Sequence, residues 1–285
     1  MVFWAFMTIL SMTHHVVVTN SVAVAKKTIT QGTIIGGGRI GGLLHSLNGG
    51  KDTLITRESD EKIHAGVESA PIYVCTRNND LEQIINDCPE DRRCDLIFLQ
   101  NGILKGYLKQ KGLEENTQGL VYFAVSKLGE APIDGKTDMN PDGLTAVTGK
   151  WGRDMAARLA KADLACKVLD KEPWNVAMLE KHIWICAFMA VGSQYEGCTV
   201  GDVEKDHKNE VKDIIAELAA AASWETGCTF KPNSLEELLL DMMLVCLGLR
   251  SAIMRPALFK VMSANHPFLH SNSFSAVGKC ATDRA

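Results

Sequence analysis

The stretch GTIIGGGRIGGLL, residues 32–44, decides the fold. Three of its glycines match the spacing G-x-G-x-x-G directly after a short apolar run, and a helix-forming pattern follows them. In a strand–turn–helix unit the first such glycine permits a tight turn, the second lets a pyrophosphate approach the backbone, and the third lets the helix pack on the strand. The helix N-terminus then faces the phosphate charge. The stretch therefore predicts a dinucleotide-binding turn made by Gly36, Gly37, Gly38, Arg39, Ile40 and Gly41.

The residues around and after the turn alternate between strand and helix patterns. Nearly continuous apolar runs predict buried strands at 32–35, 52–57, 70–77, 93–102 and 119–129. Helix patterns lie between several of them, at 39–47, 79–87 and 103–112. Only fourteen residues separate Arg57 from Ile72, a link that could barely hold a helix. Strand–helix–strand repetition at this spacing predicts an α/β fold with a Rossmann-type parallel sheet.

Beyond residue 170 the pattern becomes purely helical. Apolar or amphipathic helices are expected over 174–193, 200–225 and 234–254. Asp202 is a candidate N-cap for the second helix, and Ser234 with Glu237 has the S-x-x-E spacing of a capping box for the third. We therefore expect a cofactor-binding Rossmann domain at 28–168 and an all-helical domain at 169–285 for substrate binding and dimerisation.

The first 27 residues are set apart from this pattern. The apolar run VFWAFMTILSM (2–12) is too short to span a bilayer comfortably, and Ala23-Val24-Ala25 resembles a signal cleavage site. A basic region before the run is missing. Two interpretations stay open: a targeting segment for an organelle or the secretory route, or a leader without that role in a cytosolic protein. Neither predicts a membrane span in the mature chain.

Composition narrows the function classes. A hydrophobic content of 46% and a charged content of 22% are typical of a globular protein. The net charge of −4 argues against a nucleic-acid partner. The nine cysteines are odd in number, none forms C-x-x-C, and several lie in apolar runs. They predict buried reduced thiols, and neither a disulfide framework nor a metal site.

The end of the second predicted strand bears on the choice of cofactor. NAD-binding enzymes usually place an acidic residue there to hold the ribose hydroxyls. This sequence offers Arg57, with Glu58 beside it. A guanidinium group matches the 2′-phosphate of NADP in charge and in fork geometry. We therefore expect NADP with Arg57 at its 2′-phosphate, and a solvated arginine at a strand end is the alternative.

Five segments together resemble ketopantoate reductases, within the larger 6-phosphogluconate-dehydrogenase-like group. They are IIGGGRIGG, IYVCTRNNDL, LIFLQNGI, DGLTAVTGKWG and AMLEKHIWICAFMAVG, spread over residues 32–260 or so. The resemblance implies a Rossmann domain paired with a helical domain and an active site in the cleft between them. It also implies the reduction of a 2-oxo acid to a 2-hydroxy acid with NADPH.

The resemblance assigns roles to individual residues. Lys181 is expected as the general acid that protonates the ketone oxygen, where its charge also stabilises the developing alkoxide. Asn101 matches the asparagine beside the nicotinamide and the substrate, and Thr76 and Arg77 follow the third strand pattern at the cofactor. The expected partners are a small-molecule 2-oxo acid and, as one option, a second copy of the chain in a homodimer.

Several positions depart from the family pattern. Arg77 stands where the family has a lysine, and Ile185 and Met189 stand where it has asparagines. Two other interpretations therefore stay open. One is a catalytically degenerate NADP-binding protein that acts as a sensor or an assembly subunit. The other is an NADP-dependent 3-hydroxyacid dehydrogenase, a group that also keeps a lysine on the first helix of its second domain, although FLQNGI fits ketopantoate reductase better.

Overall fold

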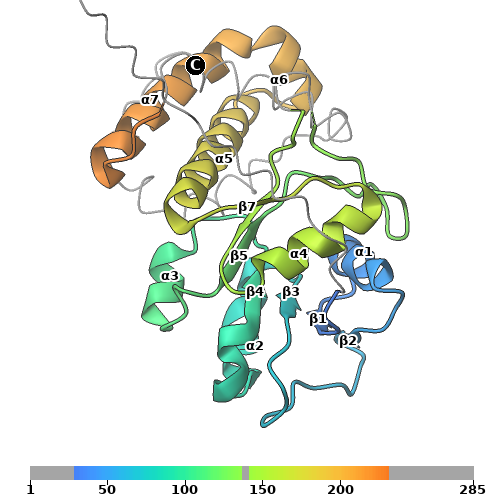
Figure 1. The fold of residues 1–285 in the computed structure, drawn as a ribbon. Helices are drawn as coiled ribbons and strands as arrows, with labels where there is room; N and C mark the ends of the chain where they lie inside the picture. The colour runs from blue at the N-terminus through green and yellow to red at the C-terminus, as the bar shows by residue number, and fades with distance from the viewer. Residues whose placement is uncertain (1–28, 137–140, 231–285) are drawn as a thin grey trace, which may run out of the picture.

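The structure, a computed structural model, describes residues 29–136 and 141–230, and Figure 1 shows its fold. Its strands are β1 Thr33–Ile35, β2 Thr53–Ile55, β3 Ile72–Val74, β4 Leu96–Phe98, β5 Thr117–Leu120, β6 Ala146–Thr148 and β7 Lys167–Val168. Its α-helices are α1 Arg39–Leu47, α2 Leu81–Asp87, α3 Lys105–Gln110, α4 Gly152–Leu159, α5 Lys171–Gly192, α6 Val200–Asp206 and α7 Lys208–Thr226. Short 3-10 helices lie at η1 Asn78–Asp80, η2 Glu90–Asp95 and η3 Ala160–Ala162.

The described strands form one sheet in the order β2-β1-β3-β4-β5-β6-β7. β1 lies parallel between β2 and β3, with Ile34 opposite Leu54 on one side and Tyr73 on the other. The chain therefore passes from β1 outward to β2 and then returns across β1 to β3. This makes the carboxyl ends of β1 and β3 the topological switch point, where open α/β sheets bind their ligands.

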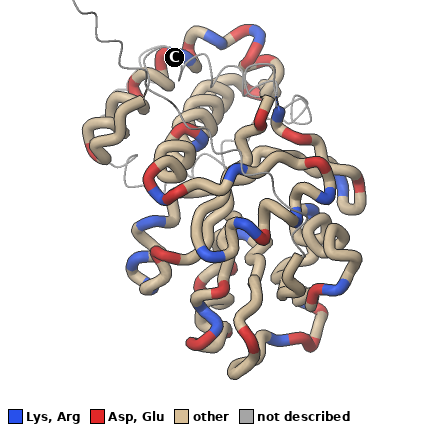
Figure 2. Tube along the Cα trace, viewed as in Figure 1, with Lys and Arg blue, Asp and Glu red and all other residues tan. Residues whose placement is uncertain are grey.

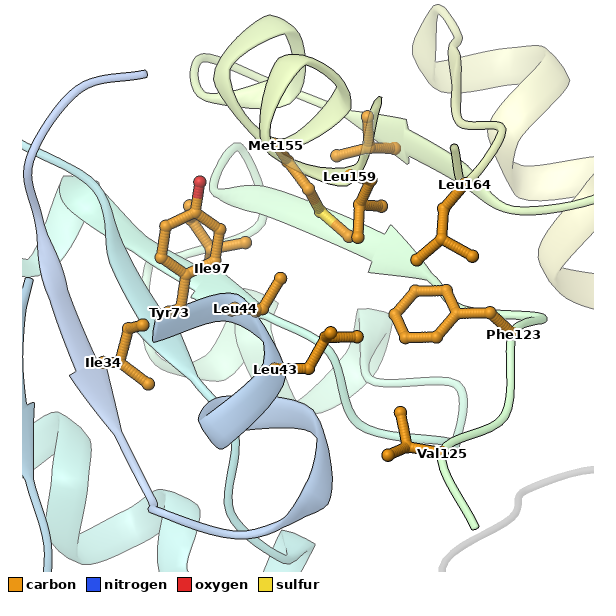
Figure 3. Packing of buried hydrophobic residues seen from close by; sticks show 11 residues of the cluster. Ile34, Leu43, Leu44, Tyr73, Ile97, Phe123, Val125, Met155, Leu159 and Leu164 are labelled. Atoms are coloured by element: carbon orange, nitrogen blue, oxygen red, sulfur yellow. The ribbon is translucent and has the colours of Figure 1, made fainter. Parts of the chain in front are cut away.

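Neighbouring residues of a strand point to opposite faces of the sheet. Helices cover both of these faces, so that alternate residues of one strand pack in different clusters. Ile34, Tyr73 and Ile97 pack in one cluster with residues of α1 and α4 (Figure 3). Val74 and Phe98 pack in a second cluster with residues of α2 and α3. Burial on both faces explains why the central strands read as continuous apolar runs.

The helices after β7 pack on each other and on the end of the sheet. α5 lies along α7 and also contacts α6 (Figure 1). Within their shared core the rings of Trp184 and Phe188 have centroids 5.5 Å apart. Near the start of α5, Trp174 packs with Leu120 and Ala146, which joins the helical part to β5 and β6.

The far end of the sheet differs from the prediction. β6 runs antiparallel to β5, so the expected all-parallel arrangement holds only from β1 to β5. The fifth strand is 117–120 rather than 119–129, because the next apolar residues leave the sheet and place Phe123 and Val125 in the core beside α1. β5 begins with the buried polar residues Thr117 and Gln118, β6 ends in the buried polar residue Thr148, and β7 is only two exposed residues long. An apolar pattern does not detect strands of this kind.

The helix expected over 200–225 is two helices, α6 and α7, which meet at His207. The N-cap of α6 is Thr199, so the prediction of Asp202 as the cap was wrong. Asp202 is instead the third helical residue: its backbone N–H donates to the Thr199 hydroxyl at 3.2 Å, and its carboxylate accepts from the Thr199 N–H at 2.8 Å. In a capping box the acidic residue stands three positions after the cap.

The predicted fold class, a Rossmann-type sheet followed by helices, is confirmed. β7 ends at Val168 and α5 begins at Lys171, and a division into two domains at 168/169 stays a prediction. The link between β2 and β3 contains no helix. The expected leader at 1–27 and the expected helix at 234–254 lie outside the described residues. Within 29–136 and 141–230, no helix is long and apolar enough to cross a membrane.

Candidate functional site

The glycine turn joins β1 to α1 at the carboxyl edge of the sheet. Gly36 has a φ of +102°, a conformation that favours glycine, and a Cβ there would lie 2.8 Å from the carbonyl oxygen of Cys75. A Cβ on Gly41 would lie 1.9 Å from the carbonyl oxygen of Gly36. The fold itself therefore requires both glycines, one for the turn and the other for the close packing of α1 against it.

Gly38 has a different role from these two. It is the N-cap of α1 with an extended backbone, and a Cβ there would meet nothing within 4 Å. No side chain caps the helix, and its first turn holds no acidic residue. The N-terminus of α1 therefore has no side-chain cap for its first amides, and there is open space beside Gly38. This arrangement fits the pyrophosphate of a dinucleotide, which needs backbone donors and close access.

The other residues of the turn are held by their neighbours. A Cβ on Gly37 would lie 3.1 Å from the methyl group of Thr56, which follows β2. Ile40 packs half-buried against the core. Arg39 is exposed, and its guanidinium donates to the carbonyl oxygens of Val125 and Ser126 at 3.1 and 3.3 Å. Arg39 thus ties the start of α1 to the segment that follows β5.

Arg57 lies beyond β2 at the same edge of the sheet. Its side chain is 84% exposed, and one guanidinium nitrogen lies 3.6 Å from the carboxylate of Asp80. Asp80 belongs to η1, which follows β3. Because a loose and exposed ion pair contributes little free energy, Arg57 can exchange Asp80 for a phosphate at small cost.

Thr76 and Arg77 follow β3, and Asn101 follows β4 at the neighbouring position along the edge. Gln100 is buried, and its amide donates to the carbonyl oxygens of the last residue of β3 and of Thr76, at 2.9 and 3.3 Å. Asn78 donates to the carbonyl oxygen of Asn101 at 3.1 Å. These bonds fix the two strand ends relative to each other and leave the side chains of Arg77 and Asn101 exposed.

Lys181 lies on α5 and is buried. Its ammonium group donates to the carbonyl oxygen of Val121 at 2.6 Å and lies 4.9 Å from the centroid of the Tyr122 ring. Val121 directly follows β5, so Lys181 reaches the carboxyl edge of the sheet from the helical part. The segment 121–126 therefore contacts both the predicted general acid and, through Arg39, the start of α1.

Cys75 lies beneath the glycine turn, where its Cβ would be 3.2 Å from a Cβ on Gly41. Burial raises the pKa of the Cys75 thiol to about 12. The thiol is therefore neutral near pH 7 and places no negative charge under the start of α1. All seven described cysteines have free thiols, but only Cys88, Cys186 and Cys198 are buried and Cys94 is exposed, which corrects the prediction that they are buried. Cys94 is exposed in η2, whereas its neighbour in the chain, Asp95, is buried.

Three residues at this edge were missed from the sequence alone. Asp80 is one of many surface carboxylates in the pattern and only the fold brings it to Arg57. Val121 contributes a backbone carbonyl, which no side-chain pattern reveals. Gln100 was detectable in principle, because a polar residue inside the apolar run LIFLQ must find hydrogen-bond partners when the strand is buried.

No protein-family model matches the sequence, and a search of curated proteins finds no significant match. Solved structures do match. 2-Dehydropantoate 2-reductase from Methylococcus capsulatus superposes with a TM-score of 0.55 at 15% identity, over 89% of this chain and 90% of that chain. A dimeric ketopantoate reductase from Staphylococcus aureus gives a TM-score of 0.50 at 15% identity, over 89% and 92%. D-mandelate dehydrogenase in complex with NADH gives 0.53 at 14% identity, over 89% and 92%.

These matches place the chain among proteins with a Rossmann-type sheet and a helical second part. More narrowly, it has the fold of the ketopantoate reductases, although its sequence is only 15% identical to the two enzymes named above. The resemblance that the five sequence segments indicated is confirmed at the level of the fold.

Proposed function

We propose that this protein is an NADPH-dependent reductase of a small 2-oxo acid. The observation that carries the proposal is the position of the segment 121–126. Its carbonyl oxygens accept hydrogen bonds from Lys181 at one end and from Arg39 beside the glycine turn at the other. A cationic acid and an anion-binding helix end thus share one edge of the sheet, as the reduction of a carbonyl group by a bound dinucleotide requires.

Different residues at the carboxyl edge of the sheet bind different parts of the cofactor. The free backbone amides at the start of α1 hold the pyrophosphate, and the absence of a side chain at Gly38 lets it approach. Arg57 binds the 2′-phosphate through charge-assisted hydrogen bonds, which favours NADPH over NADH. Asn101 orients the nicotinamide and the substrate through its exposed amide. Thr76 and Arg77 line the cofactor at the end of β3.

Lys181 acts on the substrate carbonyl. NADPH, when bound, supplies a hydride to the carbonyl carbon. Lys181 donates a proton to the carbonyl oxygen as the C=O double bond becomes a single bond, and its charge stabilises the negative charge that develops there. Lys181 then recovers a proton from solvent. The balance is one 2-oxo acid, one NADPH and one proton consumed, and one 2-hydroxy acid and one NADP⁺ formed.

A second candidate is an NADP-binding protein without turnover, which acts as a sensor or an assembly subunit. Ile185 and Met189 favour it, because neither side chain can donate a hydrogen bond to a substrate. In either case we extend the proposal to a homodimer, by analogy with the dimeric enzyme from Staphylococcus aureus. Analytical ultracentrifugation of the full chain measures the mass of the assembly, and a monomer at all concentrations would contradict it.

The test of the proposed function combines a binding and a turnover measurement. Thermal unfolding is followed with NADPH, with NADH and without a ligand. A ligand at one hundred times its dissociation constant should add about 2.7 kcal/mol to the free energy of unfolding. NADPH oxidation is then followed with a panel of 2-oxo acids. Stabilisation by NADPH with turnover supports the reductase, stabilisation without turnover supports the second candidate, and no stabilisation contradicts both.

A further inference from the structure

One face of the second half of α5 stays partly exposed, whereas the other residues of that half are buried. Among residues 181–192, only Ile185 and Met189 keep partial exposure, and all the others are buried. These two residues stand four and eight positions after Lys181. Residues at this spacing lie on one face of a helix, so Lys181, Ile185 and Met189 form a single stripe.

The stripe is apolar beyond its first residue. Residues 182–192 contain no acidic residue, lysine or arginine, and Figure 2 shows this part of α5 without charge. Ile185 and Met189 rest against the core shared with α7, and the partly buried ring of Tyr122 rests against the same core. Tyr122 also lies beside the Lys181 ammonium group. The surface next to the proposed general acid is therefore made of two aliphatic side chains and one aromatic ring.

From this surface we propose that the substrate is a 2-oxo acid with an apolar substituent, aliphatic or aromatic, that packs on Ile185 and Met189. The inference rests on the proposed function, which places the reacting carbonyl at Lys181. With the carbonyl oxygen at the ammonium group, one of the two groups on the carbonyl carbon lies next to the stripe. The carboxylate would lose its hydration against apolar side chains, so the other substituent is the group that packs there. A hydroxyl group there would lose its hydrogen bonds to water without replacement, whereas a methyl group gains from leaving water.

The test compares ketopantoate with the analogue in which a methyl group replaces its hydroxyl group. The two acids have nearly the same shape and differ only in the hydrogen-bonding capacity of the substituent. Calorimetry measures the binding of each acid to the full chain loaded with NADP⁺, where no reduction can occur. Steady-state kinetics with NADPH then gives kcat/KM for each. The methyl analogue should be preferred by about 10- to 100-fold in both measurements.

Three variants locate the source of the preference. Ile185→Asn and Met189→Asn each add an amide to the stripe and should reduce or reverse the preference for the methyl analogue. Ile214→Asn is the matched control, because Ile214 is a partly buried residue of α7 that packs on the same core outside the stripe. It should leave the ratio of the two affinities unchanged, and thermal unfolding checks that each variant is folded.

The outcomes separate the inference from the function on which it rests. A wild-type protein that binds and reduces ketopantoate better than the methyl analogue overturns the inference and leaves the reductase intact. A preference that Ile185→Asn and Met189→Asn do not change also overturns it. If the NADP⁺-loaded protein binds neither acid and the NADPH-loaded protein reduces neither, the proposed function itself fails.

Discussion

Each edge of the sheet has an aspartate–arginine ion pair, which is buried at the amino edge and exposed at the carboxyl edge. At the amino edge, Asp52 before β2 and Arg158 of α4 are fully buried, and the guanidinium donates to the carboxylate at 2.5 and 3.1 Å. At the carboxyl edge, Arg57 and Asp80 are 3.6 Å apart, and Arg57 is mostly exposed. The buried pair cannot separate without leaving a charge unpaired inside the protein, whereas the exposed pair can exchange a partner for a ligand.

Asp95, which precedes β4, extends the same contrast. Its buried carboxylate accepts hydrogen bonds from Lys150, Ser69 and Arg92 at 2.8, 2.6 and 2.9 Å. The charges at the amino edge are therefore satisfied by the protein itself. At the carboxyl edge, the N-terminus of α1 has no capping side chain and Asn101 is exposed. The amino edge therefore carries buried ion pairs that stabilise the fold. The carboxyl edge carries the groups that can bind a ligand.

The largest effect on activity should come from replacing Lys181. We expect Lys181→Met to lower kcat for the reduction of a 2-oxo acid by about 10²–10⁴, the usual range for general acid catalysis. The dissociation constant for NADPH should change little, because the proposed cofactor site lies at the edge of the sheet and not on α5. Lys171→Met is the control, since Lys171 is a half-exposed lysine of the same helix that pairs with Glu115. Full activity in Lys181→Met would show that another residue is the general acid.

The contrast between the two ion pairs predicts different costs for one chemical change. Asp52→Asn should lower the free energy of unfolding by about 3–5 kcal/mol, because it leaves the Arg158 charge buried without its partner. Asp80→Asn should cost no more than about 1 kcal/mol, because both Asp80 and Arg57 reach solvent. Urea unfolding of the two variants beside the wild type measures both values. Similar losses would remove the distinction between the edges.

Arg57 should control the choice of cofactor without controlling stability. Arg57→Ala removes a charge-assisted contact with the 2′-phosphate worth roughly 1.5–3 kcal/mol, so the ratio of the NADPH and NADH affinities should shrink accordingly. Arg153→Ala serves as the control, because Arg153 is an exposed arginine on α4. Calorimetric titrations with both cofactors give the ratio, and a ratio that Arg57→Ala leaves intact would place the 2′-phosphate elsewhere.

Asp95 should make the free energy of unfolding depend on pH under acidic conditions. Burial alone would raise the pKa of Asp95, but the hydrogen bonds from Lys150, Ser69 and Arg92 outweigh it and lower the pKa. A lowered folded-state pKa contributes stability that is complete above the unfolded value of about 3.9 and is lost as the pH falls through the folded value. Urea unfolding at a series of acidic pH values should therefore show a flatter decline in Asp95→Asn than in the exposed variant Asp87→Asn. Identical declines would contradict the role of Asp95.

The sequence predicted the parts of the fold that rest on strong local signals. The central strands and the bounds of α1 follow from continuous apolar runs and from the glycine turn. It could not predict β6, where threonines stand on both sides of Ala146 and Val147, or β7, which is two exposed residues long. The pairing of both strands depends on the rest of the sheet. The same holds for the candidate site. Gly38 and Lys181 were indicated by motif and resemblance, whereas the contacts of Arg57 with Asp80 and of Lys181 with Val121 arise only from tertiary structure.

The central claim, that the carboxyl edge binds a dinucleotide at the start of α1, is tested most directly by Gly38→Val. The fold tolerates a side chain at Gly38, since a Cβ there meets nothing within 4 Å, but the pyrophosphate does not. Gly106→Val on α3 is the matched control, because its Cβ also meets open space. Calorimetry with NADPH should show an affinity about 10- to 100-fold weaker in Gly38→Val, equivalent to the loss of about one charge-assisted hydrogen bond, and unchanged in Gly106→Val. Equal NADPH affinity in the wild type and in folded Gly38→Val would contradict the claim.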